Sequence, residues 1–349
     1  MKIGGGRRKM ASTIKDIKSE TGLALATISK YLNGGNVRTE NREKIEAAIK
    51  KLDYRPNEMA RALITKKTRT IGFVINDIAS QFSGILLRYT GQLLRKHGYS
   101  MMICDSAHDP QLEEKNIRFC VDKKVDGILL LPVGMDSGNL SSAKAANVPV
   151  VLLDREVPGS GCDCITIDNR EAARRAVNEL ARHGHTRIAV IHSEEYTGNE
   201  RYLGYLDAMR EHDLPIPDDY IYSGPMHSTQ LGYRGMEKLM ALEEPPTAIM
   251  MTNYEVSLGV VMAMNEEGLK CPEDFSLLGF DELTLALVVR PKITVVAQPM
   301  EEICQEGVRL LMARVDGETD IPPRRISIYA GIAPGESVRE IRTDRTQAG

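Results

Sequence analysis

The chain has 349 residues, of which 27% are charged and 5% are aromatic, and it contains no tryptophan. This length predicts two or three domains. The sequence contains no run of about 18 apolar residues, the length needed to span a membrane. The charged N-terminus also lacks the apolar segment of a signal peptide. We therefore expect a cytoplasmic protein that makes no membrane contact.

Charge is divided unevenly along the chain, although the formal net charge is only −3. Residues 1–69 hold 17 of the 45 Lys and Arg but only 7 of the 48 Asp and Glu, a net of +10, which leaves −13 for the remainder. A basic segment joined to an acidic body is typical of a phosphate-binding head on a sensor. A merely solvated charged face could explain one helix but not a whole domain.

The first residues, MKIGGGRRK, show no periodic pattern. Residues 1–10 are either a disordered basic arm for DNA phosphates or a wrongly assigned start, with translation beginning at Met10. Neither interpretation adds a folded domain.

Residues 13–33, TIKDIKSETGLALATISKYLN, predict two short helices separated by a turn at Gly22. Thr13 and Asp16 form a capping-box-like start. The apolar positions expected to hold the helices together are Ile14, Ile17, Leu23, Ile28 and Leu32. This is the layout of a helix-turn-helix, whose second helix enters the DNA major groove. An ordinary helix pair is the alternative.

A third helix is predicted over Thr39–Leu52, with Thr39 as its N-cap. Its apolar face consists of Ile45, Ala48, Ile49 and Leu52. Pro56 stops the chain, Asn57 can cap a short helix, and a polar basic connector, TKKTRT, follows.

Together with YRPNEMARAL at residues 54–63, these stretches resemble the DNA-binding headpiece of the LacI/GalR family of bacterial transcription regulators. The family's sequence pattern is close to TIKDVAxxAGVSxATVSRVLN, followed by a third helix and then by YRPNxxARxL. The resemblance implies a small all-α helix-turn-helix domain over residues 11–56 and a hinge helix with linker over 57–69. A two-lobed periplasmic-binding-protein-like α/β sensor would fill residues 70–349.

The body shows the matching pattern, because strand-like apolar runs alternate with amphipathic helices from Ile71 onward. Such alternation predicts parallel sheets flanked by helices. The runs are Ile71–Ile75, Ser100–Cys104, Gly127–Leu131, Pro149–Leu153, Arg187–Ile191, Thr247–Met251, Phe275–Gly279 and Ile293–Val296. Helical segments include Gly84–Lys96, Arg170–His183, Arg201–Glu211 and Glu301–Val315.

The resemblance further implies three crossings between the lobes, near Asp168, Leu283–Arg290 and Ile321–Arg325. The N-lobe would then comprise about residues 70–167 and 291–321. The C-lobe would comprise about residues 168–282 and 326–340.

Specific DNA contacts are implied for the second helix. The family pattern gives base-facing roles to Leu25, Ala26 and Lys30, and phosphate contacts to Thr27, Ser29 and Asn33. Lys30 stands where arginine is usual and lacks its planar fork, so its contact should discriminate less between bases. Ala24 replaces the serine that normally caps this helix and lacks its hydroxyl for a phosphate or capping contact. Packing is the alternative to a base-facing role for Leu25.

Leu63 is the second DNA element. In the family a leucine at this place wedges into the minor groove and kinks the duplex. The alternative is a buried leucine of a linker helix. A wedge needs its counterpart from a second chain, so we expect a homodimer on a near-palindromic operator. No leucine heptad follows the last lobe, which favours a dimer over a tetramer.

An effector site is expected between the lobes. The resemblance points to Phe82, Asp154, Thr197, Arg201, Asn253 and Asp281. An arginine flanked by aspartates suits hydroxyl-rich ligands. Tyr254 replaces the usual Asp after Asn253, so that wall of the site departs from the family pattern.

Catalytic signatures are missing: the sequence has no GxGxxG, GxxxxGK[ST] or GxSxG. Cys162-x-Cys164 is a weak metal signal among six scattered cysteines, and reduced thiols are expected. His183 and His185 are interpreted as packing residues because the family carries LGHxRIA here. We therefore predict no enzyme activity, no metal and no cofactor.

The sequence predicts an effector-controlled transcription regulator, by preference a repressor induced by a sugar or sugar phosphate. Corepression by a purine-like metabolite is the second interpretation, and control by a phosphorylated carrier protein stays open. The competing interpretation, from another class of protein, is a sugar-binding or sugar-converting protein whose basic N-terminal domain plays no part in its function.

Overall fold

The computed structural model describes residues 12–32, 35–54, 67–281, 284–318 and 320–341. It divides into two compact units, Met1–Thr68 and Arg69–Gly349. The predictions for residues 1–10, Asn33 and Leu63 lie outside the described residues, as does most of the predicted hinge helix and linker.

In its described residues, 12–32, 35–54 and 67–68, the first unit contains the helices α1 (Ile14–Thr21), α2 (Leu25–Leu32) and α3 (Thr39–Leu52). Helix α1 begins with the predicted capping box, in which the Thr13 backbone N and Oγ1 donate to Asp16 Oδ2 at 2.7 and 2.8 Å. It ends at Gly22, whose φ of 68° lies in the left-handed region. The expectation that Thr39 caps α3 was wrong: Thr39 is already helical, and Arg38 occupies the N-cap.

The core of this unit has the composition that the helical periodicity predicts. Ile17, Ile28 and Ile45 are fully buried and Ala48 nearly so. Around them pack the partly buried side chains Ile14, Leu23, Tyr31, Leu32, Ile49, Leu52 and Tyr54. Burying these faces supplies the stability that such short helices lack on their own.

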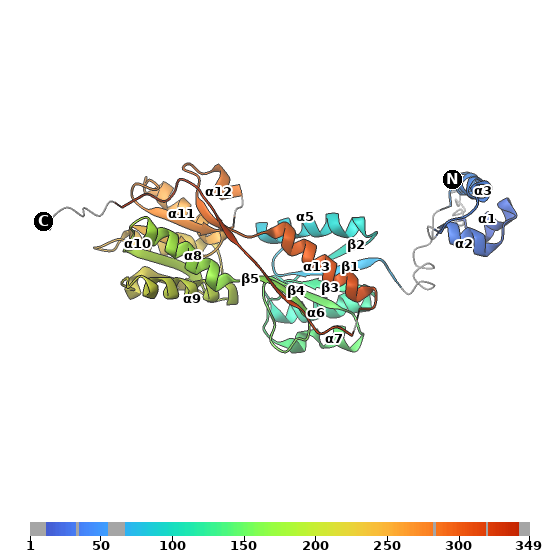
Figure 1. Ribbon diagram of the computed structural model, residues 1–349, viewed down its shortest axis with the longest axis horizontal. Coiled ribbons are helices and arrows are strands. Elements are labelled where there is room, and N and C mark those ends of the chain that lie inside the picture. The colour runs from blue at the N-terminus through green and yellow to red at the C-terminus, as the bar shows by residue number, and fades with distance from the viewer. Residues whose placement is uncertain (1–11, 33–34, 55–66, 282–283, 319, 342–349) are drawn as a thin grey trace, which may run out of the picture. The chain divides into compact units, whose positions relative to one another are not determined.

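The second unit alternates strands and helices (Figure 1). The strands are β1 (Thr70–Ile75), β2 (Ser100–Asp105), β3 (Gly127–Leu130), β4 (Val150–Leu153), β5 (Asp163–Ile167), β6 (Ile188–Ser193), β7 (Ile221–Gly224), β8 (Ala248–Met251), β9 (Ser276–Phe280), β10 (Thr294–Ala297), β11 (Arg325–Ile328) and β12 (Gly331–Ala333). The helices are α5 (Gln81–Lys96), α6 (Pro110–Asp122), α7 (Ser141–Ala145), α8 (Asn169–Arg182), α9 (Tyr196–Glu211), α10 (Thr229–Met240), α11 (Tyr254–Glu266), α12 (Thr284–Val288) and α13 (Met300–Val315).

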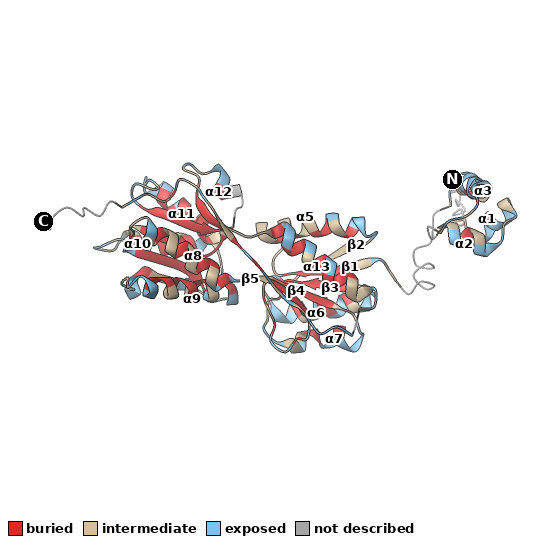
Figure 2. Ribbon diagram, in the orientation of Figure 1, coloured by how far each residue is buried: buried red, intermediate tan, exposed pale blue. Residues whose placement is uncertain are grey.

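Within the described residues these strands form two six-stranded sheets. The first has the order β11-β5-β4-β3-β1-β2 and the second β12-β10-β9-β8-β6-β7. Neighbouring strands are parallel except β10 and β12. The central strands are buried on both faces (Figure 2), as parallel sheets between helices require. The predicted α/β architecture is confirmed.

Each sheet with its covering helices is one lobe. In the first lobe, α5 and α13 share an apolar cluster with one face of the sheet, and α6 and α7 with the other. In the second lobe, α8 and α9 cover one face, and α10 and α11 the other. The cluster beneath α5 and α13 continues into that beneath α8 and α9.

The chain crosses between the lobes three times, but two crossings differ from the prediction. The first follows β5 at Asp168, as expected. The second was wrong, because β10 pairs with β9 in the second sheet and the chain crosses only at residues 298–299. The third was also wrong, because β11 pairs with β5 and the crossing falls at residues 329–330. In both cases the chain first adds a parallel strand, β10 or β11, to the sheet of the lobe that it is about to leave.

Helix α9 lies close to α8, and Gly204 permits this approach. A Cβ at Gly204 would lie 2.1 Å from the Arg170 carbonyl oxygen and 2.8 Å from Ala173 Cβ. Backbone atoms cannot yield to such a contact without moving a helix, since the interior is close-packed. The position of α9 therefore depends on this glycine.

We predict that Gly204→Ala lowers the free energy of unfolding by about 1–3 kcal/mol through overpacking. The matched control is Gly84→Ala in α5, where an added Cβ meets nothing within 4 Å. This substitution should stabilise by about 0.5–1 kcal/mol, because alanine favours the helix. Urea titration of both variants measures the difference, and equal effects would contradict the packing argument.

Candidate DNA-binding helix and effector cavity

Helix α2 buries one face and exposes the other. Ile28 is fully buried in the headpiece core. On the opposite side Ala26 and Lys30 are exposed. Leu25, at the edge of the buried face, is 38% exposed, so this leucine does not fill the core. Thr27 and Ser29 are half-buried. The described residues predicted to contact DNA thus lie at or near the surface of one helix.

A polar cavity lies between the two lobes of the body. Its volume, counted together with the open solvent at its mouth, is about 620 Å³. All six predicted effector residues line it: Phe82, Asp154, Thr197, Arg201, Asn253 and Asp281. The structure therefore brings together side chains that are separated by up to about 200 residues in the sequence.

Two of the cavity's carboxylates follow strands in the same way. Asp154 comes directly after β4 and Asp281 directly after β9, with φ values of 74° and 73°. The backbone N of Asp154 donates to Ile165 O at 2.9 Å, and that of Asp281 donates to Val296 O at 2.8 Å. Aspartate tolerates this left-handed conformation better than most residues. Each lobe thus turns an aspartate into the cavity where its strand ends.

Arg201 is the buried cation of the site, with 3% of its surface exposed. Its Nε donates to Asn169 Oδ1 at 2.8 Å, and its Nη1 donates to the Thr252 carbonyl oxygen. The guanidinium carbon lies 4.1 Å from the ring centroid of Phe280, a cation–π geometry. Burial lowers the pKa of the guanidinium below its ordinary value, although nearby Asp281 opposes this. The group is held in one orientation at the cavity wall.

The predicted residues Phe82, Thr197 and Asn253 lie at the starts of α5, α9 and α11. Asn253 is the N-cap of α11, where its Oδ1 accepts from Val256 N at 2.9 Å. Thr197 lies one helical turn before Arg201, so both occupy one face of α9. Asp281 accepts from Gln298 Nε2 at 2.6 Å, while burial raises the pKa of its carboxyl.

Sequence reasoning missed nine residues that also line the cavity: Asn76, Asp77, Ser80, His108, Arg155, Glu195, His227, Glu255 and Gln298. Several of them follow a strand directly or within a few residues, as Asp77 follows β1 and Glu195 follows β6. Ligands of parallel sheets bind outside the carboxyl ends of the strands. Applying that rule to every predicted strand could have found them.

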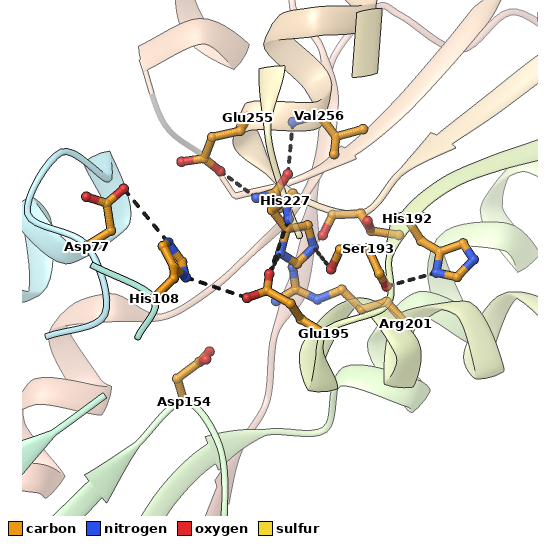
Figure 3. Close-up of polar contacts among 12 residues, drawn as sticks. Asp77, His108, Asp154, His192, Ser193, Glu195, Arg201, His227, Glu255 and Val256 are labelled. Atoms are coloured by element: carbon orange, nitrogen blue, oxygen red, sulfur yellow. Dashed lines mark hydrogen bonds and ion pairs between the residues drawn. The ribbon is translucent and has the colours of Figure 1, made fainter. Parts of the chain in front are cut away.

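Three of the missed residues form a polar network at the cavity (Figure 3). His108 Nδ1 lies 3.6 Å from Glu195 Oε1, and His227 Nδ1 lies 3.0 Å from Glu195 Oε2. Burial opposes the ionisation of Glu195, but its hydrogen bonds with both histidines outweigh burial and lower the pKa of the carboxyl. Among the described residues no three His, Cys, Asp or Glu side chains are arranged to hold a metal ion.

His185 and the cysteines lie outside the cavity. His185 is buried, bonded through Nδ1 to Thr247 Oγ1 at 2.8 Å and through Nε2 to Arg339 O at 3.1 Å. Burial lowers its pKa to about 4, as for a neutral packing residue. The six cysteines are free thiols.

Within the described residues no helix is both long and apolar enough to cross a membrane.

A helix-turn-helix unit joined to a two-lobed body with a polar interlobe cavity defines a DNA-binding regulator with a ligand sensor. Comparison with known proteins agrees. Residues 13–57 match the profile of bacterial regulatory proteins of the lacI family, and residues 177–338 match the periplasmic binding protein-like domain.

Relatives match over most of the chain. Catabolite control protein A of Priestia megaterium is 34% identical over 314 residues, which cover 89% of this chain and 94% of the relative. The transcriptional repressor CytR of Escherichia coli K12 is 31% identical, covering 89% and 92%. This chain belongs to the LacI family of bacterial transcription regulators. These relatives are regulators rather than enzymes, which agrees with the missing catalytic signatures.

Solved structures share the fold. A complex of the transcriptional regulator CelR with cellobiose is 26% identical with a TM-score of 0.70, covering 93% of this chain and 99% of that one. The lac repressor dimer bound to operator and an anti-inducer has a TM-score of 0.81 at 21% identity, covering 94% and 99%. At that identity the second likeness shows the fold alone.

We predict that Asn169→Leu destabilises the body by about 1–3 kcal/mol, because it leaves the buried Arg201 Nε without its acceptor. Asn178→Leu on the same helix is the control, since the Asn178 side chain bonds to His212 and Glu211 in exposed contacts rather than to a buried charge. That change should stay within about 0.5 kcal/mol. Urea unfolding distinguishes the two, and an equal loss would refute the positioning role of Asn169.

Proposed function

We propose that this regulator is a repressor that binds a near-palindromic operator as a homodimer, under the control of a small effector held between its lobes. The observation that carries the proposal is the interlobe cavity, whose walls come from both sheets and include Arg201 and two aspartates. A ligand that contacts both lobes favours one relative arrangement of them over others. Its site of action would be the bacterial cytoplasm, where the operator lies.

The cavity's charge favours an uncharged, hydroxyl-rich effector. Five carboxylates line it, those of Asp77, Asp154, Glu195, Glu255 and Asp281, against the guanidiniums of Arg155 and Arg201. A phosphate would bring further negative charge into this partly desolvated space, where like charges repel strongly. Carboxylates and a fixed guanidinium bind hydroxyl groups well. We therefore favour a sugar over a sugar phosphate, and the cellobiose complex of CelR supports this choice.

The second lobe exposes apolar side chains that suit a subunit interface. Leu287 and Val288 of α12 are 47% and 62% exposed, and Met262 of α11 is 42% exposed. Exposed apolar side chains mark an interaction surface where they form one contiguous patch. We propose that they contribute to the homodimer, which would also pair the two Leu63 wedges in the minor groove.

Replacing Lys30 by alanine should weaken binding to the operator by about 1–3 kcal/mol and relax base choice at one position. Lys44→Ala is the control, because Lys44 is an exposed headpiece lysine already paired with Glu40 at 2.7 Å. Selection from a random-sequence pool followed by fluorescence anisotropy measures both effects. An unchanged base profile for Lys30→Ala would reject its base-reading role.

Nonspecific DNA affinity should fall steeply with salt, because phosphate neutralisation releases counterions. Affinity that is insensitive to salt would favour the rival interpretation, a sugar-binding protein with an incidental basic head. The titration needs only the purified full chain and a random duplex.

A thermal-shift screen tests the effector class. A matching neutral sugar at 100 times its Kd should stabilise the folded protein by about 2.7 kcal/mol, and hence raise its Tm. Arg201→Lys should abolish the shift, because lysine lacks the two-point hold on Asn169 and Thr252. Arg182→Lys, an exposed change at the end of α8, should retain it. Sugar phosphates that stabilise more than their parent sugars would contradict the charge argument.

A further inference from the structure

One ion pair within the cavity joins the two lobes directly. His108 belongs to the first lobe, where it follows β2, and Glu195 belongs to the second, where it is the N-cap of α9. His108 Nδ1 and Glu195 Oε1 are 3.6 Å apart, and the pair spans the gap between the lobes in Figure 3. Their side chains are 28% and 18% exposed, so water screens the pair only partly.

Glu195 is held from its own lobe by His227. The His227 side-chain Nδ1 lies 3.0 Å from Glu195 Oε2, and the His227 backbone N donates to the same oxygen at 3.2 Å. His227 Nε2 lies 3.1 Å from Ser193 Oγ. This pattern fits a neutral ring that donates from Nδ1 and accepts the serine hydroxyl at Nε2. Burial lowers the pKa of His227, which keeps the ring neutral.

His108 is presented by a strained turn. Ala107 and His108 have φ values of 45° and 56°, in the left-handed region. The His108 backbone N donates to Asn76 O at 2.9 Å, and the Ala107 N donates to Asp105 Oδ1 at 3.1 Å. Non-glycine residues keep such conformations only where the surroundings enforce them. The imidazole is thereby directed toward the second lobe.

The charged groups around His108 come from both lobes. In the first lobe Asp77 Oδ2 lies 4.0 Å from its Nε2, and Arg155 repels its charged form. In the second lobe Glu195 forms the pair, and the electrostatic influence of Glu255 also reaches it. The hydrogen bond with Glu195 is the largest influence, and together these groups raise the pKa of His108 above its ordinary 6.5 despite partial burial.

We propose that His108, Glu195 and His227 form a proton-dependent interlobe clasp that holds the effector cavity closed. His227 fixes the carboxylate, and the carboxylate binds the protonated imidazole that reaches over from the other lobe. The clasp itself does not depend on DNA binding. Its consequence for operator affinity rests on the proposed function.

The direction of the pH dependence follows from the ion pair. With the lobes apart, His108 loses Glu195 and its pKa falls back toward 6.5. Protonation therefore favours the closed arrangement, fully below pH 6.5 and progressively less as pH rises through the raised pKa. An effector enclosed between the lobes should bind more tightly where the clasp is closed. By linkage, effector binding should raise the pKa of His108 further.

The test uses the full chain without DNA or effector. Small-angle X-ray scattering follows the radius of gyration between pH 6 and 8.5, and NMR of the histidine ring protons follows each titration. His108→Gln and Glu195→Gln remove the charge on either side of the pair while keeping a polar side chain. His212→Gln is the control, because His212 bonds to Asn178 within the second lobe.

The wild type and His212→Gln should expand as pH rises, whereas both clasp variants should keep the expanded size at every pH. In Glu195→Gln the pKa of His108 should fall. A pH-independent radius in the wild type, or expansion of His108→Gln that follows the wild type, would overturn the proposal. A separate operator titration over the same pH range distinguishes the two proposals, because expansion without any change in operator affinity would leave the clasp intact and contradict only the proposed function.

Discussion

The buried guanidinium of Arg201 is the interaction on which the effector cavity depends. It ties together four elements of the second lobe, because it projects from α9, bonds to Asn169 at the start of α8 and to the carbonyl after β8, and lies over Phe280 at the end of β9. Transferring a cation from water into the protein interior is costly unless its N–H donors are hydrogen-bonded. Here fixed acceptors bond to the guanidinium, and the same acceptors hold it in position for a ligand.

The cavity is coupled to the movement of the lobes by the chain itself. Gln298 lies on the second crossing between the lobes, and it donates to Asp281, a cavity carboxylate of the second lobe. The interlobe clasp adds a second connection from the side of β2. A change in lobe closure must therefore alter polar contacts within the cavity, and a ligand that alters those contacts must bias closure. This is the physical basis for carrying a signal from effector to DNA.

The helical headpiece and most central strands could be predicted because their apolar patterns are strong, as in Ile17, Ile28 and Ile45. Strand β5 was missed although it lies between β4 and β11, because its short sequence DCITI includes the charged Asp163. Edge strand β7, IYSG, was missed because it is short and only partly buried, and His227 was missed with it. The crossings at residues 298–299 and 329–330 were misplaced because pairing of β10 and β11 with distant strands leaves no local signal. Family resemblance supplied six cavity residues, but Glu195 and His108 are paired only by the three-dimensional arrangement.

The central claim is that the cavity and the DNA-binding helix are two sites coupled by one conformational equilibrium. Isothermal titration calorimetry can measure it reciprocally, with effector titrated into free and operator-bound protein and operator titrated into free and effector-bound protein. The account predicts that the two ratios of Kd agree and correspond to about 1–3 kcal/mol of coupling. An effector that binds with the same Kd whether or not the operator is present would contradict it.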